Sequence, residues 1–341
     1  MVEDNHRRSG PILLTKVKKR EVWIDLLRGL AVIGMIETHT VNTFLDTKLQ
    51  ATPEFDSLTY LNGLVAPTFF WVMGYVRGSS LIPGAVIRPA WPSVRRLLAI
   101  MLIGYLMHGP WELVSGSHLT REVLWRVFMV DVLQCLAISG LIIVALERMK
   151  RLTFGLAAAT LILVVALADQ AQYWRTGFIP FDAYLTSQNG SLFPIFPWAG
   201  FAIAGFLTRP LQEHSKAIAW IGITLGLGAD WVPFWDSTTA FFLERLGWVT
   251  LIAIATRHFI APLVEKLSPR FGWLELAGRE SLTLYVVHLA LIHAIPTPGG
   301  SLHLQVGPTL NIRMTFVLFL ILSTVSLGLA HFKSTFKKPT A

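Results

Sequence analysis

Long apolar runs recur along this chain and restrict it to one class of fold. They cover about residues 23–44, 58–80, 95–114, 124–146, 152–169, 192–212, 216–235, 246–265, 275–295 and 312–332. A helix that crosses a bilayer needs about 20 mostly apolar residues, and each run is close to that length. Only 15% of the residues are charged, against roughly 25% in a soluble domain. The sequence therefore predicts an all-α integral membrane protein with about ten transmembrane helices.

The distribution of lysine and arginine predicts how these helices are oriented. With the N-terminus inside, 21 of the 29 Lys and Arg residues fall in the inner segments 1–22, 77–96, 147–152, 207–217, 256–271 and 332–341. The outer loops contain only Lys48, Arg121, Arg175 and Arg245. Because basic residues are enriched in cytoplasmic loops, we expect both termini to be cytoplasmic. The expected domains are a basic N-terminal segment (1–22), a multi-helix transmembrane domain (23–332) and a basic tail (333–341).

Charge and cysteine content exclude several functions. The net charge of +8 is placed where anionic lipid or an anionic cofactor meets the cytoplasmic face, so it does not predict a nucleic-acid partner. The single cysteine, Cys135, rules out an internal disulfide and a Cys-based metal cluster, and we predict no metal. The first run is too long and too charged for a cleavable signal peptide. The expected location is the cytoplasmic (inner) membrane, with the lipid bilayer as a partner.

The first helix carries the densest set of ionisable residues. At 100° per residue, Asp25, Arg28 and His39 share one face, while Glu37 points the opposite way. The rise from Arg28 to His39 is roughly 16 Å, at about 1.5 Å per residue. Arg28 therefore lies near the cytoplasmic boundary and His39 lies in the outer half of the membrane.

The same depth reasoning sorts the other ionisable residues into two layers. The inner layer is Asp25, Arg28, Arg279 and Glu280, and the outer layer is Glu37, His39, His108, Asp131 and His288. A charged group at the centre of a spanning helix costs about 2.5–3.5 kcal/mol, so each needs an explanation. Structural alternatives are headgroup contacts for the inner layer, a Glu37–Arg126 pair and a solvated His108. Asp131 needs a partner in hydrocarbon, and Ser281, Tyr285 and His288 form a stripe on one helix.

Prolines interrupt two of the predicted helices. The second contains Ala66-Pro67-Thr-Phe-Phe-Trp71, and the sixth begins Leu192-Phe-Pro194-Ile-Phe-Pro197-Trp198. A proline within a span frees backbone carbonyls, which is tolerated where protein or a wet cavity receives them. Each segment is therefore either a structural kink or the wall of a cavity.

Several of these segments together resemble a known family. The start Asp25-x-x-Arg28-Gly29 with Arg28-x10-His39 resembles the transmembrane acyltransferases, and most closely the heparan-α-glucosaminide N-acetyltransferase catalytic region and its bacterial relatives. Supporting segments are Ala66–Gly74, Asp131-Val-Leu-Gln134, Phe193–Gly200 and Ser281-Leu-Thr-Leu-Tyr285-Val-Val-His288. The resemblance covers about residues 20–295, and it depends on the order of motifs that are individually weak.

The resemblance implies acyl transfer across the membrane. In that family a cytoplasmic acyl-CoA, here expected to be acetyl-CoA, donates its acyl group to a carbohydrate amine or hydroxyl on the other side. The family's catalytic histidine corresponds to His39, and we expect Asp131 or His288 to assist it. The pantetheine arm of CoA is comparable in length to the Arg28–His39 rise, so we expect Arg28, Arg95, Arg96 and Arg279 to bind its phosphates. N- and O-transfer both remain open, as does a homodimer.

Two functions from other classes fit the same residues. Histidines and carboxylates in a membrane cavity also occur in proton-coupled transporters and channels for small polar solutes. A lipid-binding or scaffold protein without chemistry is the third alternative. Binding of CoA would favour the enzyme over both.

Overall fold

The computed structural model describes residues 20–85, 87, 89–108, 120–187, 191–228, 237–267, 271–294 and 301–336. Most of the predicted N-terminal segment and half of the predicted tail therefore lie outside the described residues, as do the outer ends predicted for the third and seventh helices. Within the described part the chain is helical and contains no β-strand, and one isolated bridge pairs Leu45 with Leu310.

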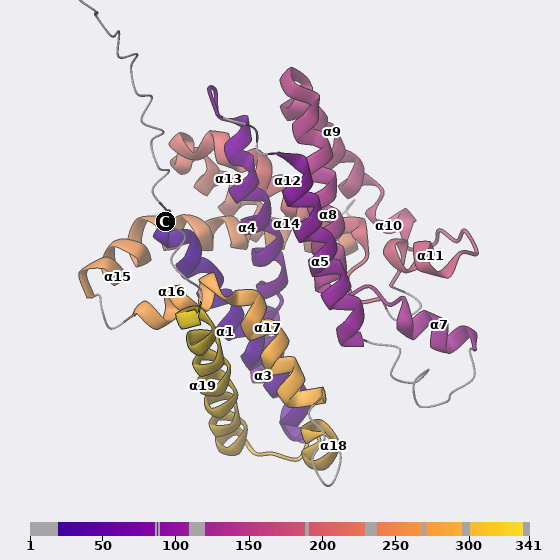
Figure 1. Cartoon of the computed structure of the whole chain (residues 1–341), viewed down its shortest axis with the longest axis vertical. Helices are drawn as coiled ribbons and strands as arrows, with labels where there is room; N and C mark the ends of the chain where they lie inside the picture. Colours follow the sequence, from indigo (N-terminus) through magenta and orange to yellow (C-terminus); the bar gives the residue numbers. More distant parts are fainter. Residues whose placement is uncertain are drawn as a thin grey trace, which may run out of the picture.

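The helices follow one another in the order of the predicted runs (Figure 1). They are α1 (Val22–Phe44), α2 (Thr47–Gln50), α3 (Pro53–Asn62), α4 (Val65–Arg77), η1 (Gly78–Leu81), α5 (Ala90–His108), α7 (Arg121–Val127), α8 (Val132–Leu146), η2 (Glu147–Leu152), α9 (Thr153–Ala166), α10 (Ala168–Ala171), α11 (Ile179–Leu185), α12 (Ile195–Thr208), η3 (Arg209–His214), α13 (Ser215–Gly228), α14 (Ser237–Ala255), η5 (Thr256–Ile260), α15 (Ala261–Leu267), α16 (Gly272–Arg279), α17 (Ser281–Leu289), η6 (Ala290–Ala294), α18 (Leu302–Val306) and α19 (Ile312–Phe336).

Four of the described helical segments are long and apolar enough to cross a membrane by length and composition. They are Ala90–Met107, Val132–Met149, Thr238–Leu267 and Ile312–Phe336. The others are shorter or more polar: α1 has 23 residues but carries Asp25, Arg28 and Glu37. The second predicted run is divided between α3 and α4, and the fourth between α7 and α8. The chain is thus an all-helical membrane protein, and the number of ten spans stays a prediction.

At each end of the molecule, hydrogen bonds and ion pairs join different segments of the chain. At one end, Arg77 pairs with Glu147 and Arg209 with Glu21, which joins segments that the charge pattern assigns to the same side. At the other end, Gln172 donates to Thr238, and the Leu192 and Phe193 amides donate to the Val130 carbonyl. These bonds follow the predicted division into inner and outer loops.

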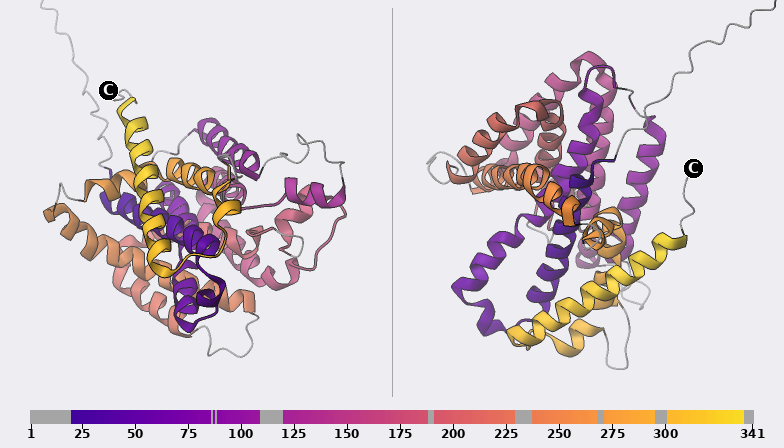
Figure 2. Two further views of the ribbon diagram at one scale, coloured as in Figure 1. Left: turned by 90° about the horizontal axis from the view of Figure 1, so that it is seen from below. Right: turned by 90° about the vertical axis from the view of Figure 1, so that its left-hand side faces the viewer.

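Both described ends of the chain meet at the junction of α16 and α17. Gly278 lies directly against the Asp25 carbonyl near the start of α1. Two residues later, the Glu280 carboxylate accepts a hydrogen bond from Lys333 near the end of α19, at 3.0 Å. Figure 2 shows α19, in yellow, along the outside of the molecule with its final turns at this end. The start of α1 and the end of α19 therefore lie at the same end of the molecule.

Two groups of helices make up the core (Figure 1). In one, α12 packs against α4, α8 and α9, with α5 against α8; in the other, α1 packs against α16, α17 and α19. Glycines allow the closest approaches: an added methyl carbon would lie 1.7 Å from the Ala202 oxygen at Gly74 and 2.0 Å from the Trp71 oxygen at Gly205. Small residues at such crossings let helix backbones approach within a membrane.

This close packing predicts a large effect of one methyl group. Gly74→Ala places its methyl carbon against the rigid backbone of α12, so we expect α4 and α12 to separate. Overpacking of this kind typically costs about 1–3 kcal/mol. We expect a lower thermal unfolding midpoint in detergent. Gly155→Ala, at an open position on α9 with no atom within 4 Å, is the control and should keep the midpoint or raise it. Equal midpoints for the two variants would contradict the packing.

Candidate functional site

Two histidines from opposite ends of the chain form a direct pair. His39 lies on α1 and His288 on α17, and the distance from His39 Nδ1 to His288 Nε2 is 2.7 Å. Their rings stack with centroids 5.0 Å apart. His288 is fully buried, whereas His39 is partly accessible. The structure thus brings together two of the three predicted catalytic residues.

The backbone fixes the tautomer of this pair. His288 Nδ1 lies 2.7 Å from the Leu284 carbonyl oxygen, and a carbonyl only accepts, so Nδ1 donates its proton. In a neutral imidazole the second nitrogen then accepts, so His288 Nε2 accepts from His39 Nδ1–H. His39 Nε2 is left as the nitrogen with an unprotonated lone pair. The arrangement therefore leaves a base at His39 with its ring orientation fixed.

Asp131 lies beside this pair at a break between two helices. Its side chain caps α8, with Oδ1 accepting from the Val132 amide at 2.7 Å, while Oδ2 accepts from the Tyr285 hydroxyl at 3.3 Å. The Tyr285 ring is edge-on to His288, with centroids 5.8 Å apart. Asp131 also interacts electrostatically with His39. Tyr285 and His288, two residues of the predicted stripe, thus connect the Asp131 carboxylate to the histidine pair.

Two helices, α1 and α17, set the positions of these residues. α1 is continuous from Val22 to Phe44, so Arg28 and His39 are separated by roughly 16 Å along one helix. α17 passes into the π turn η6 directly after Leu289, and π turns are frequent at functional sites. Of the remaining outer-layer residues, Glu37 interacts with Asn62.

The predicted phosphate-binding arginines lie at the other end of α1. Arg28 is half-buried, 3.9 Å from Asp25, and interacts electrostatically with Arg96 and Arg20. The nearer cation to Asp25 is Arg20, which donates two hydrogen bonds to its carboxylate. Arg95 and Arg96 are exposed on the first turns of α5. Arg28 and Arg96 therefore form a positive group at the inner end.

Arg279 differs from Arg28 and Arg96 because its nearest charged partner is Glu275. It is exposed at the end of α16, and its guanidinium lies 3.8 Å from the Glu275 carboxylate. Glu275 also interacts electrostatically with Arg20, so Arg279 belongs to the same inner layer. Its guanidinium therefore has a carboxylate neighbour on the same helix.

A second feature of the site is a cavity of about 270 Å³ at the outer end. Pro194 and Pro197 line it together with the aromatic rings of Phe196, Trp198 and Phe241. The sequence left a kink and a cavity wall open for the sixth helix, and both are present: the backbone departs from helical geometry at Phe196, and Pro194 and Pro197 line the cavity. Polar groups in the lining come from Gln172, Ser187 and Thr238.

Hydrogen bonds to Val130 join the wall of the outer cavity to the segment that carries Asp131. The Val130 carbonyl accepts hydrogen bonds from the Leu192 and Phe193 amides at 3.0 and 3.2 Å, and the next residue is Asp131. The fully buried Cys135 lies on the same side, with its sulfur 3.7 Å from the Pro194 oxygen. Among the described residues, no group of three His, Cys, Asp or Glu side chains could hold a metal.

Comparison with known proteins identifies one family. The model described as "Heparan-alpha-glucosaminide N-acetyltransferase, catalytic" matches residues 20–235. No curated protein matches the chain. The matched region contains α1 with Arg28 and His39, both arginines of α5, Asp131 and the prolines of the outer cavity, while His288 and Arg279 lie beyond it.

Proposed function

Because the chain belongs to the heparan-α-glucosaminide N-acetyltransferase catalytic-domain family, a family of membrane acetyltransferases, we propose that it transfers acetyl groups across a cytoplasmic membrane. The donor is acetyl-CoA on the cytoplasmic side. The acceptor is an amino or hydroxyl group of a carbohydrate on the other side. The observation that carries this proposal is the bonded chain from the Leu284 carbonyl through His288 to His39.

The proposed reaction proceeds through His39. Its Nε2 removes the proton from the acceptor amine or hydroxyl as that atom attacks the thioester carbonyl carbon. The new C–N or C–O bond forms and the C–S bond breaks, and the imidazolium returns the proton to the CoA thiolate. Proton transfer of this kind typically contributes 10²–10⁴-fold in rate. The Asp131 carboxylate stabilises the transient imidazolium, and His288 holds the ring in the productive tautomer, as the third group does in a catalytic triad.

The two substrates bind at opposite ends of the molecule. Arg28, Arg95 and Arg96, with Arg279, bind the phosphates of CoA at the inner end, because guanidinium groups match phosphate geometry. The pantetheine arm then follows α1 to His39. The outer cavity binds the acceptor: its aromatic rings offer flat apolar surfaces to a sugar, and its amide and hydroxyl groups offer hydrogen bonds.

Removing the inner arginines tests the donor site. The triple variant Arg28→Gln, Arg95→Gln and Arg96→Gln should bind CoA more weakly, and the difference from wild type should be largest at low salt. Screening already weakens exposed charge contacts at about 0.15 M salt, where the Debye length is about 8 Å. Titration of CoA in detergent at two salt concentrations measures this. Arg121→Gln, an exposed arginine of the outer end, is the control. Unchanged affinity in the triple variant would remove these residues from the donor site.

Site-directed labelling tests the orientation. Cys135 is the only cysteine and is fully buried, so single cysteines at exposed positions report their own accessibility. In intact cells, Ser57→Cys on α3 should react with a membrane-impermeant maleimide. Lys216→Cys on α13 should react only after the membrane is opened. The reverse pattern would place the termini outside and exclude a cytoplasmic donor site.

A further inference from the structure

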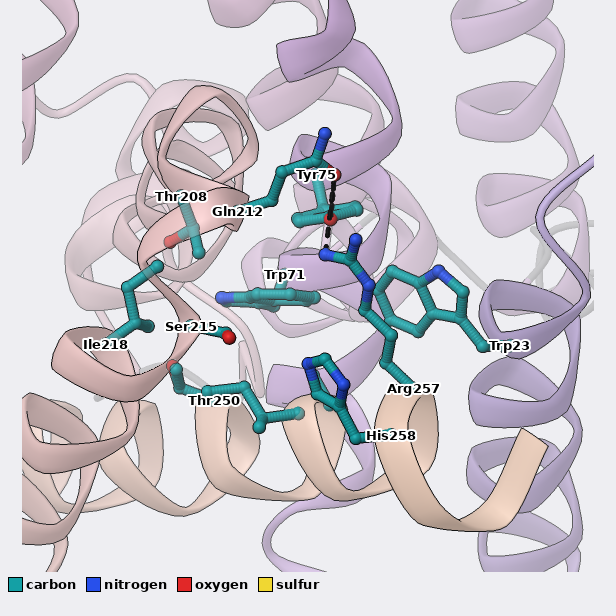
Figure 3. Close-up of a pocket in the computed structure, with 12 residues that line it drawn as sticks. Trp23, Trp71, Tyr75, Thr208, Gln212, Ser215, Ile218, Thr250, Arg257 and His258 are labelled. Carbon is teal, nitrogen blue, oxygen red and sulfur yellow. Dashed lines mark hydrogen bonds between the residues drawn. The ribbon is translucent and has the colours of Figure 1, made fainter. Parts of the chain in front are cut away.

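A second cavity lies at the inner end of the molecule, between α1, α4, α13 and α14 (Figure 3). Its volume is about 30 Å³. Among the residues that line it are Trp71 and Tyr75 of α4, Gln212 of η3, and Arg257 and His258 of η5. It is separate from the acetyl-transfer site, because Trp23, its contact on α1, points about 160° away from His39 at 100° per residue.

The cavity contains a polar donor without a partner. Trp71 is 2% exposed, and its Nε1–H has no hydrogen-bond acceptor among the described residues. Figure 3 shows this nitrogen pointing toward Ser215 on the cavity wall. A buried donor left unsatisfied typically costs about 1–3 kcal/mol, so an acceptor atom from a bound molecule is favoured here.

The charges around the cavity favour an anion. Arg257 and His258 lie in the π turn, and no carboxylate is among the residues that line the cavity. Arg257 lies 3.4 Å from the Gln212 side-chain oxygen, which also accepts from Tyr75 at 3.1 Å. The nearby carboxylate of Glu21 is paired with Arg209, and the Arg209 guanidinium lies over the ring of Tyr75. Within the part of the chain that the structure describes, the hydrogen-bond acceptor of Arg257 is thus the uncharged side chain of Gln212.

The size of the cavity and its surroundings identify the carrier of that anion. A water needs about 10–15 Å³ in such a cavity, so the space of about 30 Å³ admits two or three oxygens of one phosphate group but no sugar or nucleobase ring. Directly after His258, Phe259, Leu263 and Leu267 recur every four residues, and they are 73%, 56% and 41% exposed. An exposed apolar stripe beside a phosphate-sized positive cavity at the membrane boundary fits a lipid with its chains along η5 and α15.

We propose that this inner cavity binds the phosphate of an anionic phospholipid from the cytoplasmic leaflet. Trp71 Nε1–H and the Arg257 guanidinium donate to the phosphate oxygens, and His258 lies at the open side. Anionic lipids of that leaflet are attracted to clustered basic residues. A soluble phosphate could offer the same oxygens, and the experiment below separates the two sources.

The test measures lipid retention by the full-length protein in mixed micelles, using native mass spectrometry. With phosphatidylglycerol, wild type should retain one lipid that Arg257→Gln retains at least about tenfold more weakly, as expected for loss of a charge-assisted hydrogen bond. Trp71→Phe removes the N–H together with part of the aromatic surface and should also weaken retention. Lys266→Gln, a cation on α15 outside the cavity lining, is the control and should retain lipid as wild type does.

Three results would overturn the proposal. One is equal retention by wild type, Arg257→Gln and Trp71→Phe, each with an unchanged unfolding midpoint in lipid-free detergent. Another is equal retention of phosphatidylglycerol and the neutral phosphatidylcholine. The third is displacement of the lipid by inorganic phosphate or CoA at concentrations that saturate the arginines of the donor site, which would assign the cavity to a soluble phosphate.

Discussion

Replacing His39 by alanine should lower acetyl transfer at least about 10²-fold, the lower end for the loss of a general base. The variant should still insert in the membrane and still bind CoA, because His39 is roughly 16 Å from Arg28 along α1. The reason for the large effect is that His39 Nε2 is the unprotonated nitrogen whose lone pair is not used within the bonded pair, and it belongs to the more accessible of the two residues.

The measurement is the rate of acetyl transfer at saturating acetyl-CoA, with CoA affinity measured in parallel. His303→Ala serves as the matched control, because His303 also lies at the outer end but pairs with Ser301 on its own helix turn. Its rate should stay near that of wild type. If His39→Ala keeps a near-normal rate while His288→Ala is inactive, the roles are reversed and the first-helix motif is structural.

The second large effect is expected for His288. His288→Ala removes the acceptor of the His39 Nδ1–H bond, so the His39 ring loses both its orientation and its fixed tautomer. We expect a fall in rate of about 10²-fold with little change in CoA affinity, because a wrong tautomer alone costs up to about 10⁴-fold in a serine protease triad. His288→Gln should recover part of the rate, since a glutamine side-chain oxygen can accept from Nδ1–H.

Asp131→Asn is the comparison for this variant. Asparagine keeps the size and an oxygen for the Tyr285 hydroxyl but removes the negative charge, so the rate should fall less than in His288→Ala. A pH–rate profile separates the roles, because loss of the charge near His39 should move the profile, whereas a purely structural defect lowers the rate at every pH. A larger fall for Asp131→Asn than for His288→Ala would make the carboxylate the main partner of His39.

Much of the fold follows from apolar periodicity and charge. α1 was predicted at 23–44 and is observed at Val22–Phe44, and α19 was predicted at 312–332 and is observed at Ile312–Phe336. The breaks within the second, fourth and ninth runs were missed. Phe128-Met129-Val130 is as apolar as a helix interior, so hydropathy does not mark it. Asp131 before a long apolar run is the signal that could have located the break, because aspartate is a preferred helix N-cap.

The sequence predicted that His39 and His288 lie at the same depth in the membrane, but it did not predict their contact. Depth follows from helix rise, whereas contact depends on how α1 and α17 pack, and the two histidines are 249 residues apart in sequence. Asp131 or His288 was expected to assist His39. The structure bonds His39 Nδ1 to His288, whereas Asp131 accepts from Tyr285. The inner cavity was not predicted, because Arg257 and His258 resemble ordinary loop cations until the π turn brings them to Trp71.

The uninterrupted course of α1 also limits how this chain can diverge in length. One residue inserted between Arg28 and His39 turns the histidine by about 100° away from α17, and four inserted residues restore its face only with a shift of about 6 Å. At Gly29 the backbone of α1 approaches α16 so closely that an added methyl carbon would lie 2.2 Å from the Leu274 oxygen, so a shift of α1 along its axis would bring a larger side chain into this contact. An insertion or deletion between Arg28 and His39 should therefore separate His39 from His288, whereas substitutions that keep the helix leave the spacing unchanged.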